Sequence, residues 1–135
     1  MKYVVLAGRI LYSFIFIMAA PHHFSAQLVA YADAAHVPLA SIAVPLSGII
    51  AGLGGLSIVL GYKAKWGAWL LVLFLVPVTL MMHNFWAASD AMTAQMQTAM
   101  FIKNTALLGT ALMISYFGSG PLSLDNKFKK HAASV

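Results

Sequence analysis

Residues 100–107, Met-Phe-Ile-Lys-Asn-Thr-Ala-Leu, place a lysine and an asparagine inside an apolar run that extends from Thr98 to Gly118. About 20 helical residues, rising roughly 1.5 Å each, cross the hydrocarbon layer of a bilayer, so this run predicts a membrane span. A lysine at such a position costs about 2.5–3.5 kcal/mol on insertion scales. Lys103 is therefore expected to face other protein, a wet cavity or a ligand.

The composition indicates an integral membrane protein with a single domain over residues 1–135. The chain is 61% hydrophobic and 8% charged, whereas soluble domains carry about 25% charged residues. It contains no cysteine, which excludes disulfides, thiol chemistry and thiolate metal ligands. The net charge of +5 does not indicate nucleic acid as a partner, because the basic residues lie mostly at the ends of apolar runs.

Four apolar runs predict spanning helices at about residues 3–20, 41–61, 66–86 and 98–118. The N-terminus is similar to a signal peptide, but Arg9 interrupts its apolar core and three more runs follow, so we expect a retained first helix. The mixed segment 25–39 predicts a short helix at the membrane surface. Gly48 and Gly52 form a G-x-x-x-G pair, which favours close helix packing within the bundle or between two copies of the chain.

The positive charges predict the orientation. With four spans, both termini and the link at 62–65 lie on one side of the membrane. That side holds Lys2, Lys63, Lys65, Lys127, Lys129 and Lys130. The opposite loops, 21–40 and 87–97, contain no Lys or Arg. Because cytoplasmic loops are rich in Lys and Arg, we expect an all-α antiparallel four-helix bundle with both termini inside and a cytoplasmic basic tail at 119–135.

Helix lengths then place one polar cluster near the outer surface, formed by His23, His83, Asn84, Lys103 and Asn104. Lys103 would lie about six residues, or roughly 9 Å, into its helix from the outer side. One interpretation is a pocket for the head of an amphipathic ligand such as a quinone, which offers two carbonyl acceptors and needs protonatable neighbours. The other is that Lys103 reaches the interface and the asparagines only join helices.

A metal or haem site in this cluster would depend on His22, His23 and His83. Adjacent histidines on a helix point about 100° apart, so the set converges poorly, and no metal site is predicted. A second cluster lies inside. Arg9 is expected to pair with Asp125, because no acidic residue occurs within a span and Asp125 is the only one on that side.

Several pieces of the chain together resemble the DoxX family of small bacterial membrane proteins. They are Gly8-Arg9, Gly54-Gly55-Leu56 with Leu60-Gly61, Met82-His83-Asn84-Phe85-Trp86, Phe101-Ile102-Lys103-Asn104 with Gly109, and the segment 118–125. The resemblance implies a multi-pass protein of the bacterial inner membrane, linked to quinone-dependent redox systems and redox protein partners. It makes Arg9, His83, Lys103, Asn104 and Asp125 candidate site residues. The segment Pro21-His22-His23-Phe24 departs from the family pattern.

These observations predict a quinone-binding membrane subunit of an oxidoreductase system, with the pocket near Lys103 and His83. A non-enzymatic scaffold that anchors soluble redox or stress-response partners is the alternative. A carrier for a small amphipathic solute is a third, although no inverted repeat is visible. Whether the chain is catalytic stays open at this point.

Overall fold

The computed structural model describes residues 1–132 as helices joined by short connections, with no strand in that part of the chain. The elements follow one another as α1 (Lys2–Ala19), η1 (Ala20–Phe24), α2 (Ala26–Ala34), α3 (Ala40–Leu60), α4 (Ala64–Met82), η2 (Phe85–Ala87), α5 (Ala91–Phe117) and α6 (Leu124–Ala132). Four helical stretches are long and apolar enough to cross a membrane: 2–24, 40–60, 64–87 and 91–117. The prediction of an all-α membrane protein with four spans is confirmed.

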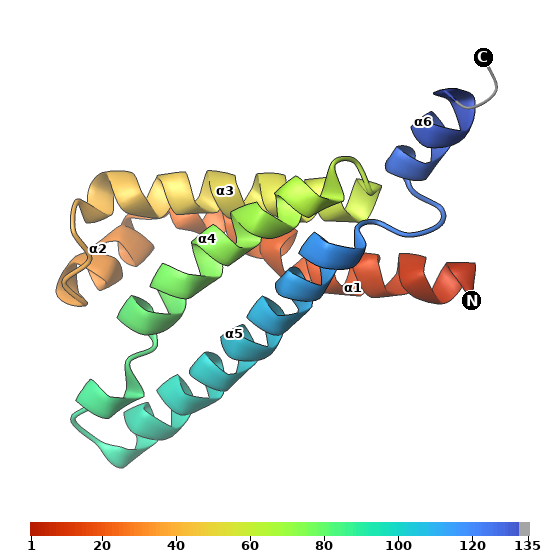
Figure 1. The fold of residues 1–135 in the computed structure, drawn as a ribbon. Helices are drawn as coiled ribbons and strands as arrows, with labels where there is room; N and C mark the ends of the chain where they lie inside the picture. The colour runs from red at the N-terminus through yellow and green to blue at the C-terminus, as the bar shows by residue number, and fades with distance from the viewer. Residues whose placement is uncertain (133–135) are drawn as a thin grey trace.

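The spans pack in chain order, α1 against α3, α3 against α4 and α4 against α5. In Figure 1, α4 and α5 diverge from α1 and α3 toward the end that holds α2 and η2. We call this the outer end. The inner end holds the N-terminus, the α3–α4 link and α6. One bond ties the first span to the last at mid-height: Tyr12 Oη donates to the Leu107 carbonyl over 2.9 Å.

The core lies between the spans and is built from small and branched side chains. Phe16 of α1, Ile58 of α3, and Leu71 and Leu75 of α4 are all buried in one cluster. A smaller cluster of Ala32, Ala40 and Val44 fixes α2 against α3, which confirms the short helix expected in segment 25–39. The remaining large apolar side chains point outward, as expected for a surface that faces lipid acyl chains.

Gly48 and Gly52 pack against the same chain rather than leaving a free face. A Cβ at Gly48 would lie 2.5 Å from His23 Cβ and 3.0 Å from the Ala20 carbonyl oxygen, and one at Gly52 would lie 3.3 Å from Ala20 Cβ. Small residues let helices approach closely where apolar helices gain little else by associating. The pair therefore holds η1 against α3, which is the packing within the bundle that was one of its two expected roles, and a contact between two copies stays a prediction.

Two helix boundaries differ from those expected. The third span leaves the α-helix at Met82, and residues 85–87 form a 3-10 turn instead of continuing to Trp86. The fourth span begins at Ala91 rather than Thr98, because Asp90 caps it by accepting the Thr93 N–H over 2.9 Å. An N-cap carboxylate satisfies a backbone donor that the helix itself cannot, so the polar residues after Asp90 join the helix.

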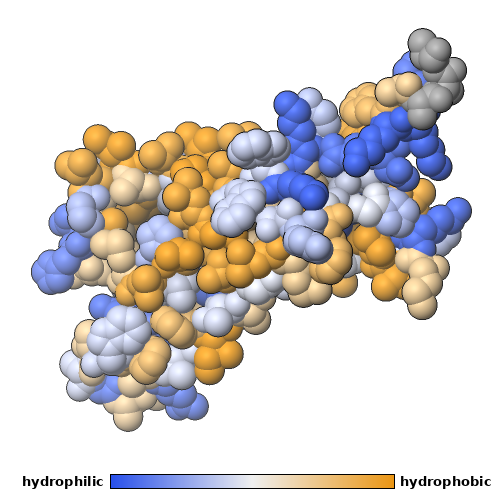
Figure 2. Space-filling model, viewed as in Figure 1, coloured by the Kyte–Doolittle hydropathy of each residue, from blue (hydrophilic) through white to orange (hydrophobic). Residues whose placement is uncertain are grey.

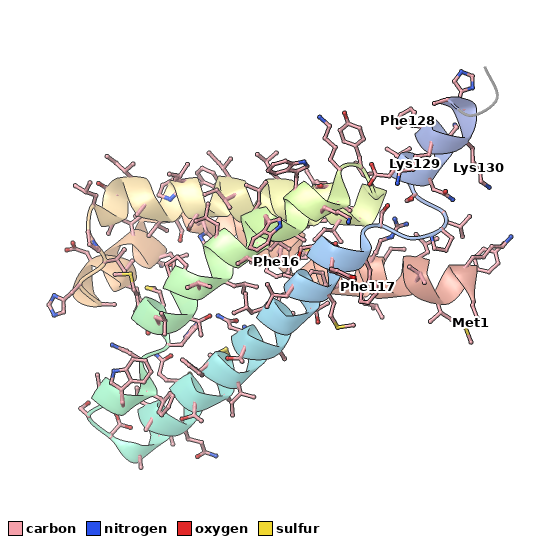
Figure 3. The ribbon with its side chains drawn as sticks, viewed as in Figure 1. Met1, Phe16, Phe117, Phe128, Lys129 and Lys130 are labelled. Carbon is pink, nitrogen blue, oxygen red and sulfur yellow. The ribbon has the colours of Figure 1, made fainter. Side chains whose placement is uncertain are left out.

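The tail is partly helical. Ser123 Oγ accepts the Asn126 N–H and starts α6, whereas the last three residues of the expected tail lie outside the described part of the chain. Figure 2 shows hydrophilic side chains gathered at the inner end around α6, and apolar ones over α3 and α4. In Figure 3, Lys129 and Lys130 project from α6 away from the bundle.

Replacing Gly48 by valine tests the close contact with η1. We expect a loss of about 1–3 kcal/mol, because the new side chain must displace His23 and the Ala20 backbone. The matched control is Gly109→Ala, where a Cβ meets nothing within 4 Å, and where a gain of about 0.5–1 kcal/mol is expected from higher helix propensity. Thermal unfolding in detergent measures both, and equal melting temperatures for the two variants would contradict the packing argument.

Candidate functional site

A chain of side-chain hydrogen bonds joins three elements at the outer end. His83, at the C-terminus of α4, places Nδ1 2.8 Å from Gln97 Oε1 of α5. The Gln97 amide then donates from Nε2 to the Tyr31 hydroxyl of α2 over 2.9 Å. Neither Tyr31 nor Gln97 was among the site residues expected from the sequence. This outer relay, made of Tyr31, His83 and Gln97, is the longest side-chain network across the diverging helices.

The relay lies beside a hollow of about 250 Å³ between α2 and the connection from α4 to α5. Its apolar walls are Met82 and several alanines. Its polar wall comes from Tyr31, Asn84, Ser89, Thr93 and Gln97. We call this hollow the outer cleft. No charged side chain lines it, so it suits neutral groups that exchange hydrogen bonds.

The relay leaves specific donors and acceptors free. Because Gln97 Oε1 only accepts, this hydrogen bond places a proton on His83 Nδ1, and the other ring nitrogen, Nε2, takes no part in the relay. The Tyr31 hydroxyl accepts from Gln97 and keeps its own proton to donate. The Asn84 side chain caps no helix, and its carboxamide offers both a donor and an acceptor at the cleft wall. The outer cleft can therefore hold a neutral ligand through several hydrogen bonds.

Asp90 sits just outside the cleft and fixes the start of α5. Hydrogen bonds from the Thr93 side chain and backbone lower the pKa of the Asp90 carboxyl below its usual value. The stabilisation of the first turn of α5 is thus complete above the ordinary carboxyl pKa, and it is lost as the pH falls through the lowered pKa. At neutral pH the carboxylate is ionised, and the cleft wall formed by Ser89 and Thr93 is held in place.

The other expected members of the outer cluster do not converge on this cleft. His23 is buried in η1, with Nδ1 2.9 Å from Ser47 Oγ and its ring 5.6 Å from that of Phe74. Asn104 is only 4% exposed and faces the interior of the bundle. Lys103 is exposed, and its ammonium donates to Met100 Sδ over 3.5 Å. Because α5 begins at Ala91, Lys103 lies near the middle of its helix. The sequence had placed it within two turns of the outer end.

At the inner end, Arg9 is 4% exposed and donates from Nη2 to the Leu122 carbonyl over 2.6 Å. Its Nη1 lies against Gly61, the left-handed residue that ends α3 with φ 64°. A side chain at Gly61 would collide with the guanidinium. The partial negative charge of a helix C-terminus favours a cation there, so the end of α3 and the Leu122 carbonyl offset part of the cost of burying the charge, while Nε and Nη1 of Arg9 are buried without a hydrogen-bond partner.

Asp125 binds the start of α4 and not Arg9. Its carboxylate accepts the N–H groups of Lys63 and Ala64 at 2.8 and 3.3 Å, and the Ser119 hydroxyl at 3.1 Å. No direct ion pair joins Arg9 and Asp125 in residues 1–132, although the charge of Asp125 acts on Arg9, so the pairing expected by elimination is at most electrostatic. The physical reason is that free backbone N–H groups at a helix N-terminus also attract a carboxylate.

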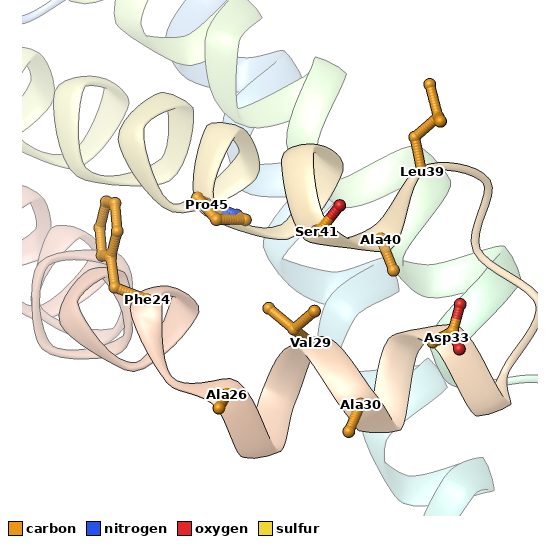
Figure 4. Close-up of a pocket in the computed structure, with 9 residues that line it drawn as sticks. All are labelled: Phe24, Ala26, Val29, Ala30, Asp33, Leu39, Ala40, Ser41 and Pro45. Atoms are coloured by element: carbon orange, nitrogen blue, oxygen red, sulfur yellow. The ribbon is translucent and has the colours of Figure 1, made fainter.

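The remaining candidate sites are a metal-binding cluster and a second hollow. Within the described residues, no three His, Asp or Glu side chains lie close enough to hold a metal ion. A second hollow of about 670 Å³ lies between α2 and the start of α3. Figure 4 shows Phe24, Val29 and Pro45 around it, with Asp33 at the far edge. It is wide and largely apolar, and we do not assign it a ligand.

Replacing Gln97 by leucine removes both bonds of the outer relay. Each neutral hydrogen bond contributes about 0.5–1.5 kcal/mol, so α2 should loosen from α5. We expect faster amide hydrogen exchange across residues 26–34, measured by mass spectrometry. Gln95→Leu, an exposed position on the same helix, serves as the control. Unchanged exchange in the Gln97 variant would show that the relay does not hold α2.

Replacing Asp125 by alanine tests the inner junction. Loss of an N-cap costs about 0.5–2 kcal/mol, and we expect a lower melting temperature in detergent. Asp125→Asn keeps an acceptor oxygen and should retain most of the stability. Asp33→Ala, at an exposed position, should have no effect. An Asp125→Ala variant as stable as the parent would rule out the capping role.

Comparison with known proteins changes the family assignment. The model of the SURF4 family matches residues 1–131. No curated protein matches the chain, and no solved structure matches it either. The DoxX assignment is therefore wrong, and the quinone-linked oxidoreductase function that followed from it is overturned. Quinone as a cofactor and redox proteins as partners lose their support with it. The chain is a multi-pass membrane protein that belongs to the SURF4 family.

Proposed function

We propose that the chain is a membrane receptor that binds a neutral, hydrogen-bonding segment of another protein in the outer cleft. The observation that carries this proposal is the composition of the cleft wall. Tyr31, Asn84, Ser89, Thr93 and Gln97 supply donors and acceptors, and none of them is charged. Such a wall fits the N–H and C=O groups of a peptide or the side chains of polar residues.

The geometry favours binding over catalysis at this site. Among the described residues that line the cleft, no nucleophile is hydrogen-bonded to a base, and His83 donates its Nδ1 proton to Gln97. A base and nucleophile within hydrogen-bond reach are what acyl or group transfer would require. The outer relay instead positions the wall, because it ties α2 to α5 across the mouth of the bundle.

Family membership supports the same proposal. The SURF4 family comprises membrane proteins similar to cargo receptors of the endoplasmic reticulum. A receptor of that kind needs a recognition surface on the side opposite its cytoplasmic basic end. The outer cleft lies on that side, because the lysines outside the spans are at the inner end. The family is not specific to the bacterial inner membrane, so we propose only the orientation and not the organelle or cell type.

A photo-cross-linking residue at Ala87, which is exposed and lines the cleft, tests this function in native membranes. We expect a discrete protein adduct after irradiation, and a several-fold loss of that adduct when Asn84→Ala is added. The matched control places the same cross-linker at Leu112, an exposed position on α5 outside the cleft, and should give no such adduct. Lipid adducts alone at both positions, or an adduct insensitive to Asn84→Ala, would refute the receptor function.

A further inference from the structure

Lys103 lies deep within a membrane span. α5 runs from Ala91 to Phe117, so Lys103 is about 18 Å along the helix from one end and about 21 Å from the other. The hydrocarbon layer is about 30 Å thick. The lysine is also six residues inward of Gln97, which belongs to the outer relay. The 27 residues of α5 span about 40 Å, so its ends extend beyond this layer, and a charge within the layer is costly unless it meets a partner or its side chain reaches the interface.

Among the described residues 1–132, Lys103 has no such partner. Lys103 is exposed, and its ammonium touches only the thioether of Met100, a weak acceptor. The sequence has three acidic residues in all, and each of them lies outside the spans: Asp33, Asp90 and Asp125. A second copy of this chain would therefore bring no carboxylate to this depth either.

The surface around Lys103 permits close approach by another helix. α5 is the least buried of the four spans, because only 11% of the residues in its apolar segment are buried inside the protein. Ala99, Ala106 and Gly109 are exposed along it. A Cβ at Gly109 would meet nothing within 4 Å. Small residues on an exposed helix face let a second backbone pack closely, which is how membrane helices associate.

We propose that this face of α5 binds a transmembrane helix of another protein that carries an aspartate or glutamate level with Lys103. The charge selects a carboxylate, and the depth selects one borne by a helix. The charge of an anionic lipid lies in the headgroup layer, outside the hydrocarbon, whereas Lys103 lies six residues, about 9 Å, inward of Gln97. The interface is separate from the outer cleft, so it does not rest on the proposed receptor function.

A synthetic probe tests the proposal directly. The full-length protein, labelled with a fluorescence donor, is placed in phosphatidylcholine vesicles at pH 8 with an acceptor-labelled Leu/Ala spanning peptide. One peptide carries a single glutamate at mid-depth, and its twin carries glutamine. We expect several-fold stronger energy transfer with the glutamate peptide. Lys103→Met should abolish the difference, and Lys103→Arg should retain it.

Matched variants separate this interface from general association in the vesicle. Gly109→Ile should weaken transfer by blocking close approach, whereas Leu53→Ile, on the exposed face of α3, should not. The melting temperature of Lys103→Met shows whether the variant folds. Equal transfer for the two peptides, or a difference that survives Lys103→Met, would overturn the proposal. So would a Lys103-dependent signal given only by an acceptor-labelled anionic lipid.

Discussion

The carboxylate of Asp125 is the contact on which the arrangement of the inner end depends. It binds the free N–H groups of Lys63 and Ala64 at the start of α4, and the Asp125 N–H donates to the Gly61 carbonyl at the end of α3. Asp125, which lies outside the turn between α3 and α4, thus forms hydrogen bonds to both sides of that turn. Near hydrocarbon, an unsatisfied backbone group is costly, so this contact also fixes where the chain after α5 must run.

Arg9 uses the same segment for a different purpose. Its guanidinium reaches the Leu122 carbonyl and rests against Gly61, so backbone dipoles offset part of the cost of a buried charge that forms no direct ion pair within residues 1–132. The turn residues Lys63 and Leu122 both adopt positive φ, which is unfavourable for residues other than glycine. Asp125 and Arg9 each bind within or beside these turns, and their hydrogen bonds offset that cost.

The sequence predicts the spans well, because hydropathy reports them directly. Arg9, Tyr12, Ser13 and Phe16 are buried on α1, and His23 continues that face through Pro21. The sequence does not predict the outer relay, because the apolar pattern places Gln97 in the loop 87–97. Asp90 was the available signal, since an N-cap residue there starts α5 a full seven residues earlier. Tyr31 meets Gln97 only through the tertiary path of α2, which no local pattern encodes.

The same reasoning explains why short motifs misassigned the family. Gly54 and Gly55 lie against Leu71 and Phe16, so their pattern records close helix packing, which unrelated membrane bundles need equally. Fold does not fix function, and a site must be argued from its own chemistry. Here the site chemistry divides by charge. The outer cleft is lined by neutral hydrogen-bonding groups, whereas Lys103 presents a charge on an apolar span. The two surfaces therefore suit different partners: the outer cleft suits a neutral polar group, and Lys103 suits a negatively charged one.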